Sequence, residues 1–167
     1  MKRGSHHFEV LYTRYAPAIY RYLHWQSRDA ILAQDLTSST FEHAWRARAS
    51  FKGGSEQAWL YRIARNLLTD HWRRKKDLLM DDIPALSEQL ESTAPTYDYD
   101  EEQRLGQLGR AMDQLSEDLR TIVVLRFIEG LSAKEVGAIL GLSEGNIRIK
   151  QFRALGQMRK WMDYEKN

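Results

Sequence analysis

Apolar residues in this chain recur mainly at steps of three and four, the spacing of one face of an α-helix. The first run predicts a helix in which these steps relate Phe8, Leu11, Tyr12, Tyr15, Ile19, Tyr22 and Leu23. Because Pro17 lies inside this run, it should kink the helix or mark its restart. A second helix is predicted over about 29–49, with Leu32, Leu36, Ala44 and Trp45 facing inward. No useful stretch alternates with the period of two of a strand, so the sequence predicts an all-α protein.

The segment FKGGS, residues 51–55, separates the second helix from a third that runs to about Lys76. Two glycines prevent continuation of the helix, and Ser55 is a suitable N-cap for the next one. The third helix is predicted to bury Trp59, Leu60, Ile63, Leu67 and His71 or Trp72. Its outward face is predicted to carry Arg62, Asn66 and Arg73, with Tyr61 and Arg65 beside them.

The third helix ends in the run RRKK, Arg73 to Lys76, which has two interpretations. Cations at a helix C-terminus are favoured by the helix dipole, so the run can be a solubilising helix end, with Asp70 paired to Arg73 and Arg74. Arginine interleaved with aromatic residues is also the chemistry that binds single-stranded DNA, through phosphates and stacked bases.

The last third of the chain, Leu131 to Trp161, predicts two helices joined by a tight turn. Ser132 and Glu135 have the spacing of a capping box, Gly141 ends the first helix, and Ser143 can cap the second. Gly137 lies where two crossing helices need a small side chain. The second helix is predicted to bury Ile147, Ala154, Leu155 and Met158 and to expose Asn146, Arg148, Ile149, Phe152 and Arg153. This pattern favours a helix-turn-helix that binds the DNA major groove; two helices of an ordinary bundle are the alternative.

The net charge of +2 conceals a strong asymmetry along the chain. Residues 1–78 carry 14 Lys+Arg against 7 Asp+Glu, a net charge of +7. Residues 79–105 carry 1 against 8, net −7, and residues 106–167 carry 10 against 8, net +2. The sequence therefore predicts two small helical domains, 1–78 and 106–167, joined by a flexible acidic linker over 79–105.

Several classes of protein are excluded or disfavoured by composition. The absence of cysteine excludes disulfide scaffolds and thiolate metal sites and favours a cytoplasmic location. No run approaches the roughly 18 apolar residues of a membrane span, and no signal peptide opens the chain. No nucleotide-binding, metalloprotease or nucleophile-elbow motif occurs. The nearest approach to a paired-carboxylate site, Asp81 and Asp82, lies in the predicted linker, so no enzymatic activity is expected.

Two stretches of the chain resemble one known family. AQDLTSSTFEHAWRARASFKGGSEQAWLYRIARNLLTDHWRRKK resembles the promoter-melting domain of the extracytoplasmic-function sigma factors of bacterial RNA polymerase. The matching residues are Ala33, Asp35, Leu36, Phe41, Ala44, Trp45, Trp59, Leu60, Ile63, Ala64, Arg65, Asn66, Asp70, Arg73 and Arg74. LSEDLRTIVVLRFIEGLSAKEVGAILGLSEGNIRIKQFRAL resembles the C-terminal helix-turn-helix domain of that family. The resemblance covers about residues 8–78 and 108–160, in the family's order.

The resemblance implies a sigma factor that binds core RNA polymerase and directs promoter recognition and strand opening. The implied contacts to the −35 element as duplex are Ser143, Glu144, Asn146, Arg148, Ile149, Phe152 and Arg153. Those to the −10 element, where a flipped base is captured, are Phe51, Lys52, Gly53, Gly54, Ser55, Tyr61, Arg62, Arg65, Asn66, Arg73 and Arg74. Those to polymerase are Asp35, Ser38, Ser39 and Glu42.

The chain departs from the family pattern at four positions. Ser38 replaces the family's glutamine and Ser39 an acidic residue, on the face that contacts polymerase in relatives. Ile149 replaces the usual serine, and Gln151 an apolar residue that would weaken the inward stripe. These differences concern affinity and base preference more than the fold.

The implied partners are core RNA polymerase and promoter DNA, both as duplex and as single strand. An anti-sigma protein is a further candidate, because members of this family are commonly sequestered by one. No cofactor, metal, small-molecule substrate or membrane insertion is expected. The alternative function is that of a stand-alone helix-turn-helix repressor or activator, which would bind its operator duplex without polymerase.

Overall fold

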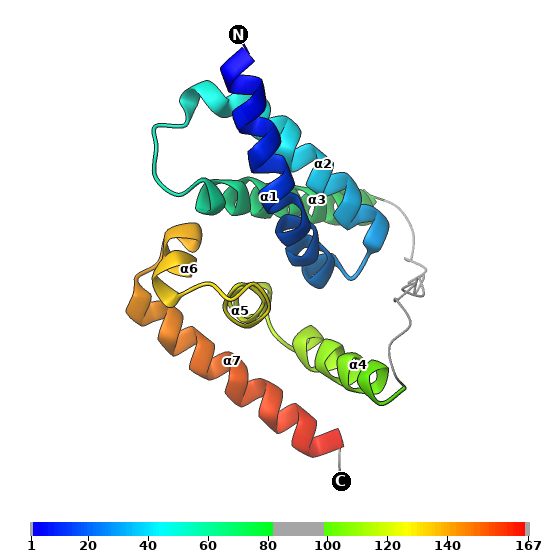
Figure 1. The fold of residues 1–167 in the computed structure, drawn as a ribbon. Helices are drawn as coiled ribbons and strands as arrows, with labels where there is room; N and C mark the ends of the chain where they lie inside the picture. The colour runs from blue at the N-terminus through cyan, green and yellow to red at the C-terminus, as the bar shows by residue number, and fades with distance from the viewer. Residues whose placement is uncertain (1, 82–98, 166–167) are drawn as a thin grey trace. The chain divides into compact units, whose positions relative to one another are not determined.

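A computed structural model of the chain describes residues 2–81 and 99–165 (Figure 1). Within those residues every regular element is a helix, which confirms the all-α prediction. The chain divides into two compact units, Met1–Ser92 (unit 1) and Thr93–Asn167 (unit 2). Most of the predicted linker lies outside the described residues. At its two ends, however, helix α3 extends to Asp81 and helix α4 begins at Tyr99.

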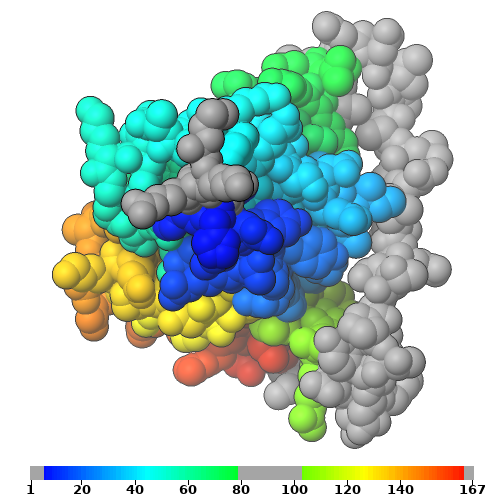
Figure 2. All heavy atoms as spheres, turned by 45° about the horizontal axis from the view of Figure 1, so that its top comes forward, coloured from blue at the N-terminus to red at the C-terminus, as the bar shows by residue number. Residues whose placement is uncertain are grey.

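Unit 1 is a bundle of three helices, α1 (Lys2–Ser27), α2 (Ala30–Ala47) and α3 (Glu56–Asp81), with a short 3-10 helix η1 (Arg48–Ser50) after α2. Each long helix contacts the other two, and α3 crosses behind α1 and α2 in the ribbon view (Figure 1). Figure 2 shows α1 (blue) and α2 (light blue) side by side on the surface. The buried core draws on all three helices and includes Leu11, Ile19, Tyr22, Leu23, Leu36, Phe41, Ala44, Leu60, Ala64 and Leu68.

Helix α1 runs as one element through Pro17, so of the two outcomes predicted there, a kink or a restart, the restart is wrong. A proline inside a helix costs about 3 kcal/mol, because it removes an N–H donor and crowds a carbonyl in the preceding turn. On either side of Pro17, however, α1 is packed into the bundle: Leu11 and Ile19 are both buried. Tertiary packing along the whole helix therefore outweighs the local preference.

Unit 2 contains α4 (Tyr99–Asp113), α5 (Glu117–Val123), the π-helical turn η2 (Val124–Ile128), α6 (Ala133–Leu140) and α7 (Glu144–Glu165). Helix α7 is the organising element, because α4, α5 and α6 all contact it. The buried core includes Met112, Leu115, Ile122, Leu125, Val136, Ile139, Ile147, Ala154 and Met158.

The turn between α6 and α7 is built as its sequence predicts. Ser132 Oγ accepts from the Glu135 N–H, and the Glu135 carboxylate accepts from the Ser132 N–H, forming a complete capping box. Gly141 ends α6 with a φ of +68°, a left-handed conformation that favours glycine. Ser143 Oγ then accepts from the Asn146 N–H at 3.2 Å and caps α7. The helix-turn-helix is therefore specified locally, residue by residue.

Gly137→Ala is expected to destabilise unit 2 by about 1–3 kcal/mol, the usual effect of overpacking. Gly137 is buried, and an added Cβ would lie 2.6 Å from the Leu142 carbonyl oxygen, a backbone atom that cannot move away freely. Urea unfolding of the full chain, followed by helical circular dichroism, measures the effect. Gly145→Ala is the matched control, because a Cβ there meets nothing within 4 Å. Equal midpoints for the two variants would contradict the close approach of the backbone.

Candidate nucleic-acid interface

One face of α3 carries side chains that suit a nucleic-acid backbone. Positions 62, 66, 69, 73 and 76 follow steps of three and four and therefore share one side of the helix. With a rise of 1.5 Å per residue, this face extends over about 21 Å. All its members are exposed, and we call them the basic stripe: Arg62, Asn66, Thr69, Arg73 and Lys76.

Two residues predicted for this interface lie outside the basic stripe, and only one of them, Tyr61, is buried. Tyr61 is only 1% exposed and meets Tyr22 of α1 edge-on, with 5.4 Å between ring centroids. Its place in the helical repeat is with the core positions 64 and 68, so its prediction as an outward residue was wrong. Arg74 is exposed but lies about 100° around the helix from Arg73, outside the basic stripe.

A third residue predicted for this interface lies at the edge of the basic stripe. Arg65 is half-buried at the margin of the basic stripe. Thr69 was missed by the sequence reasoning, although the helical repeat counted from Arg62 could have identified it, and Lys76 was noted only as the end of the RRKK run.

Within the basic stripe, Arg73 is paired to a residue of its own helix. Its Nη2 donates to Asp70 Oδ1 at 2.9 Å, which confirms the predicted pairing of these two side chains. Both are well exposed, at 69% and 46%, and an exposed ion pair of this kind contributes at most about 1 kcal/mol. A phosphate can therefore replace Asp70 at little cost, so the guanidinium remains available to a bound strand.

The FKGGS loop before α3 has a backbone that only glycine adopts readily. Gly53 and Gly54 have φ values of +93° and +97°, and an added Cβ at either position would meet no atom within 4 Å. Ser55 ends the loop as the N-cap of α3, its Oγ accepting from the Ala58 N–H at 3.1 Å. The loop forms an open arc between η1 and α3 (Figure 1). Its tip, which includes Lys52, is exposed.

An aromatic contact anchors the base of this loop to α3. The Phe51 ring packs on Trp59, with 4.9 Å between ring centroids and 32° between ring planes. Both side chains are half-buried. Trp59, predicted to be a core residue, therefore also supports the loop. The contact leaves Lys52 and the glycine backbone free of packing at the tip.

The four residues predicted to contact polymerase share one face of α2, at positions 35, 38, 39 and 42. Asp35 and Ser38 are exposed, and Ser39 is half-buried. Glu42 is exposed and accepts from Arg46 Nη2 at 2.5 Å.

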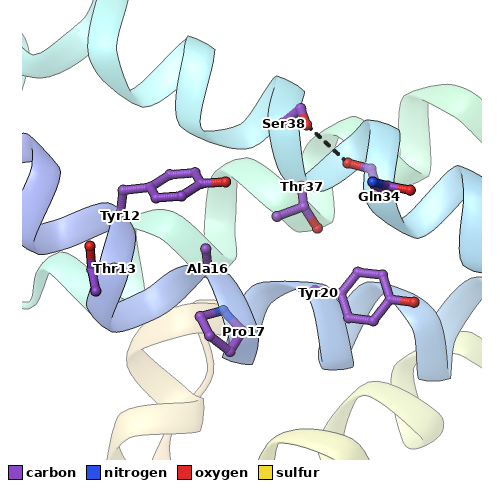
Figure 3. A pocket seen from close by; sticks show the side chains of 8 residues that line it. All are labelled: Tyr12, Thr13, Ala16, Pro17, Tyr20, Gln34, Thr37 and Ser38. Carbon is purple, nitrogen blue, oxygen red and sulfur yellow. Dashed lines mark hydrogen bonds between the residues drawn. The ribbon is translucent and has the colours of Figure 1, made fainter. Parts of the chain in front are cut away.

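Beside this face, α1 and α2 enclose a groove of about 450 Å³ (Figure 3). Ser38 belongs to its wall and donates from Oγ to the Gln34 carbonyl at 3.2 Å. Two tyrosine rings, Tyr12 and Tyr20, contribute from α1. The complete lining is Tyr12, Thr13, Ala16, Pro17, Tyr20, Gln34, Thr37 and Ser38. Since none of these residues is charged, the groove suits uncharged side chains of a partner protein.

The outward face of α7 carries the side chains predicted to contact duplex DNA. Its exposed residues are Asn146, Arg148, Ile149, Phe152 and Arg153, all as predicted. Phe152 is 81% exposed, an unusual position for a large apolar ring. Exposed cations interspersed with apolar groups match the chemistry of the major groove, where guanine presents acceptors and thymine presents a methyl group.

The buried side of α7 differs from the prediction at one position. Ile147, Ala154 and Met158 are buried as expected, but Leu155 is 41% exposed. Leu155 lies about 80° around the helix from Ile147, at the margin of the inward stripe. Gln151 occupies the inward stripe instead, and its Oε1 accepts from Arg126 Nε at 2.9 Å. Gln151, which stands where the family has an apolar residue, is thus hydrogen-bonded to η2.

The described parts of the chain were compared with the requirements of a membrane span and of a metal site. Within residues 2–81 and 99–165, no helix combines the length and the apolar composition needed to cross a membrane. Across the same residues, no three histidine, cysteine or acidic side chains gather as a metal site would require.

Both units match known protein families. The family model described as Sigma-70 region 2 matches residues 11–77, and the model described as Sigma-70, region 4 matches residues 111–160. The chain is 32% identical over 157 residues to the ECF RNA polymerase sigma factor SigE of Mycolicibacterium smegmatis, covering 93% of this chain and 61% of that protein. It is 33% identical over 155 residues to the RNA polymerase sigma factor CarQ of Myxococcus xanthus, covering 92% and 87%. The chain thus spans about three fifths of the length of the mycobacterial relative.

A solved structure shares the fold. It is that of the sigma factor RpoE of Bartonella quintana, in complex with the anti-sigma factor NepR. The TM-score is 0.76 at 24% identity, with 93% of this chain and 96% of that chain covered. At this identity, the likeness shows the fold alone.

Proposed function

This chain belongs to the sigma-70 family, in its extracytoplasmic-function group, and from that premise we propose that it binds core RNA polymerase and directs promoter recognition and strand opening. One observation carries the proposal. A single chain holds two exposed faces suited to nucleic acid, the basic stripe of α3 and the outward face of α7, within the units that match regions 2 and 4.

In this proposal the protein acts in the cytoplasm, where polymerase and promoter DNA meet. It performs no chemistry on a substrate and requires no cofactor or metal ion. Phosphodiester synthesis belongs to polymerase, and the chain contributes binding energy and position.

We assign residues 106–167 to the −35 element as duplex. A helix-turn-helix places the N-terminal residues of its second helix against base edges. Arg148 and Arg153 have the donors for guanine or for phosphates, and Ile149 and Phe152 suit thymine methyl groups. Asn146 can donate to a phosphate or a base, beside Ser143 and Glu144 at the start of α7.

We assign residues 1–78 to the −10 element. Extruding a base from the stack costs a few kcal/mol, which contacts to the flipped base and to the displaced strand must offset. The Phe51–Ser55 loop has the open backbone to hold such a base, and the basic stripe has the charge to hold the strand's phosphates. Tyr61, buried in the core, is left out of this assignment.

The remaining proposed contacts are with proteins. The face of α2 formed by Asp35, Ser38, Ser39 and Glu42 is assigned to polymerase, beside the uncharged groove. The structural neighbour RpoE is described in complex with an anti-sigma factor, and we extend that kind of partner to this chain. Such a protein would compete with polymerase for the same exposed surfaces.

Run-off transcription tests the function as a whole. Core polymerase is supplied with genomic fragments, with and without the full chain, and new transcripts are mapped at their 5′ ends. Transcripts that depend on the chain and share upstream elements are the expected result. A stand-alone repressor or activator would instead bind operator duplex without polymerase and would start no transcription with core enzyme alone.

Lys76→Ala is expected to weaken binding to −10 single strands more than Arg74→Ala does. Each variant removes one exposed cation from the same helix end, but only Lys76 lies in the basic stripe. Each phosphate contact in a single strand contributes about 0.7 to the slope of log K against log salt concentration. In a salt titration of oligonucleotide binding, with the chain assembled on core polymerase, the slope should decrease by about 0.7 in Lys76→Ala and by less in Arg74→Ala. Identical salt slopes in the two variants would contradict the proposal that the basic stripe binds the phosphates of the strand.

A further inference from the structure

The first turn of α7 contains an ion pair between two residues of the proposed duplex-binding face. Glu144 Oε1 accepts from Arg148 Nη2 at 2.5 Å and from Arg148 Nε at 3.2 Å. The two residues are four apart, so they lie on the same side of the helix. A carboxylate in a DNA-binding face repels phosphate, so its presence there calls for a function of its own.

The surroundings of Glu144 keep its carboxylate ionised. Its pKa lies below the usual value, first because Arg148 donates a hydrogen bond to it and then because of the Arg148 charge. Lys134 of α6 and Arg126 of η2 lower that pKa further through their charges. The negative charge also lies at the N-terminal end of the helix, where the helix dipole favours it.

The two side chains are 71% and 45% exposed, but two hydrogen bonds join them, and while the pair is formed it leaves one edge of the Arg148 guanidinium facing outward. The Nε and one Nη2 hydrogen are directed at Glu144, which leaves the Nη1 and outer Nη2 hydrogens at the tip of the fork. Those tip hydrogens form the pair of donors that guanine O6 and N7 accept together. The pair also draws the guanidinium towards the N-terminus of α7, the end that a recognition helix places deepest against the bases.

We propose that Glu144 is a specificity-determining residue: it orients Arg148 towards a base edge and repels the phosphates that would otherwise bind that arginine. This inference rests on the proposed function, since it concerns how the −35 element is recognised. Glu144 acts through Arg148 and is a positioning residue. In its absence Arg148 still binds DNA, but to phosphates on any sequence.

The test compares sequence preference among variants of the full chain assembled with core polymerase. The probe is a library of promoter duplexes, randomised over the upstream element of a promoter identified by run-off transcription, and bound molecules are sequenced. Arg148→Ala should lower discrimination at its contacted position by about 5- to 150-fold, the range of a bidentate base contact. Glu144→Gln should lower discrimination at the same position by a smaller factor, about three- to tenfold on that scale.

A second measurement separates positioning from helix stability. If Arg148 is released to a phosphate in Glu144→Gln, the slope of log K against log salt for non-specific duplex becomes steeper by up to about 0.9. A loss of helix stability alone would weaken binding without steepening this slope.

The double variant Glu144→Gln/Arg148→Ala, together with the two single variants, forms a double-mutant cycle. In the Arg148→Ala background, Glu144→Gln should have no further effect on discrimination. A remaining effect would mean that Glu144 contacts a base directly and would overturn the positioning role. Wild-type preference retained in Glu144→Gln would overturn it as well. A wild-type chain without any upstream preference would overturn the proposed function itself, which the other outcomes leave intact.

Discussion

A chain in which Gly53 and Gly54 are both replaced by alanine is expected to lose promoter opening while it keeps binding to the −35 duplex. Both glycines have φ above +90°, where a Cβ costs about 1–2 kcal/mol per residue. The backbone conformation of the loop must therefore change, and the proposed binding site for the flipped base changes with it. Because 1.4 kcal/mol is a factor of ten in an equilibrium, opening should fall by about tenfold or more.

Permanganate footprinting of unpaired thymines, with core polymerase present, measures this opening. Mobility shifts on the upstream duplex report −35 binding in the same preparation. Gly156→Ala is the matched control, since an added Cβ in that part of α7 meets nothing within 4 Å and the backbone there is helical. If the double loop variant still opens DNA, the loop does not hold the flipped base. Loss of upstream binding as well would indicate a wider failure to assemble.

The isolated chain is expected to bind promoter duplex poorly, and core polymerase is expected to raise that affinity by about 10²-fold or more. Two small units joined by a linker that the sequence predicts to be flexible would sample many separations, so the second contact would gain little from the first unless a scaffold fixes the span. The predicted linker over 79–105 carries a net charge of −7 and competes with DNA for the net +7 of residues 1–78. Salt screens this competition over a Debye length of about 8 Å at 0.15 M.

Electrophoretic mobility shifts at about 0.15 M salt, with and without core polymerase, test the expectation directly. The same duplex with a scrambled upstream element serves as the specificity control. Tight and sequence-specific binding by the chain alone would contradict the need for a scaffold. That result would favour the stand-alone repressor, which needs no polymerase to find its operator.

The parts of the fold that follow local rules could be predicted from the sequence. The Ser132–Glu135 capping box, the left-handed Gly141 and the Ser55 N-cap each involve residues within a few positions of one another. Such interactions need no knowledge of the rest of the chain. The exposed face of α7 was predicted equally well, because a strong helical repeat determines which side chains share a side. The family resemblance added the roles of these residues, which the periodicity alone does not contain.

The sequence by itself determined helices α1, α2, α3, α6 and α7, several of their caps and the order of the two units. It did not predict α4, whose residues 99–105 were assigned to the linker, and the tertiary structure decided which side of a helix is buried where the pattern is ambiguous. Tyr61 carries a polar hydroxyl and stands in the sequence between apolar Leu60 and charged Arg62. Only its packing against Tyr22 shows that it belongs to the core. Pro17 stays within α1 because α2 and α3 hold that helix along its length. The pairing of Gln151 with Arg126, 25 positions away, likewise depends on how η2 meets α7. Local sequence encodes hydrogen bonds within a turn of helix, whereas burial and long-range pairing arise only when helices distant in sequence come into contact.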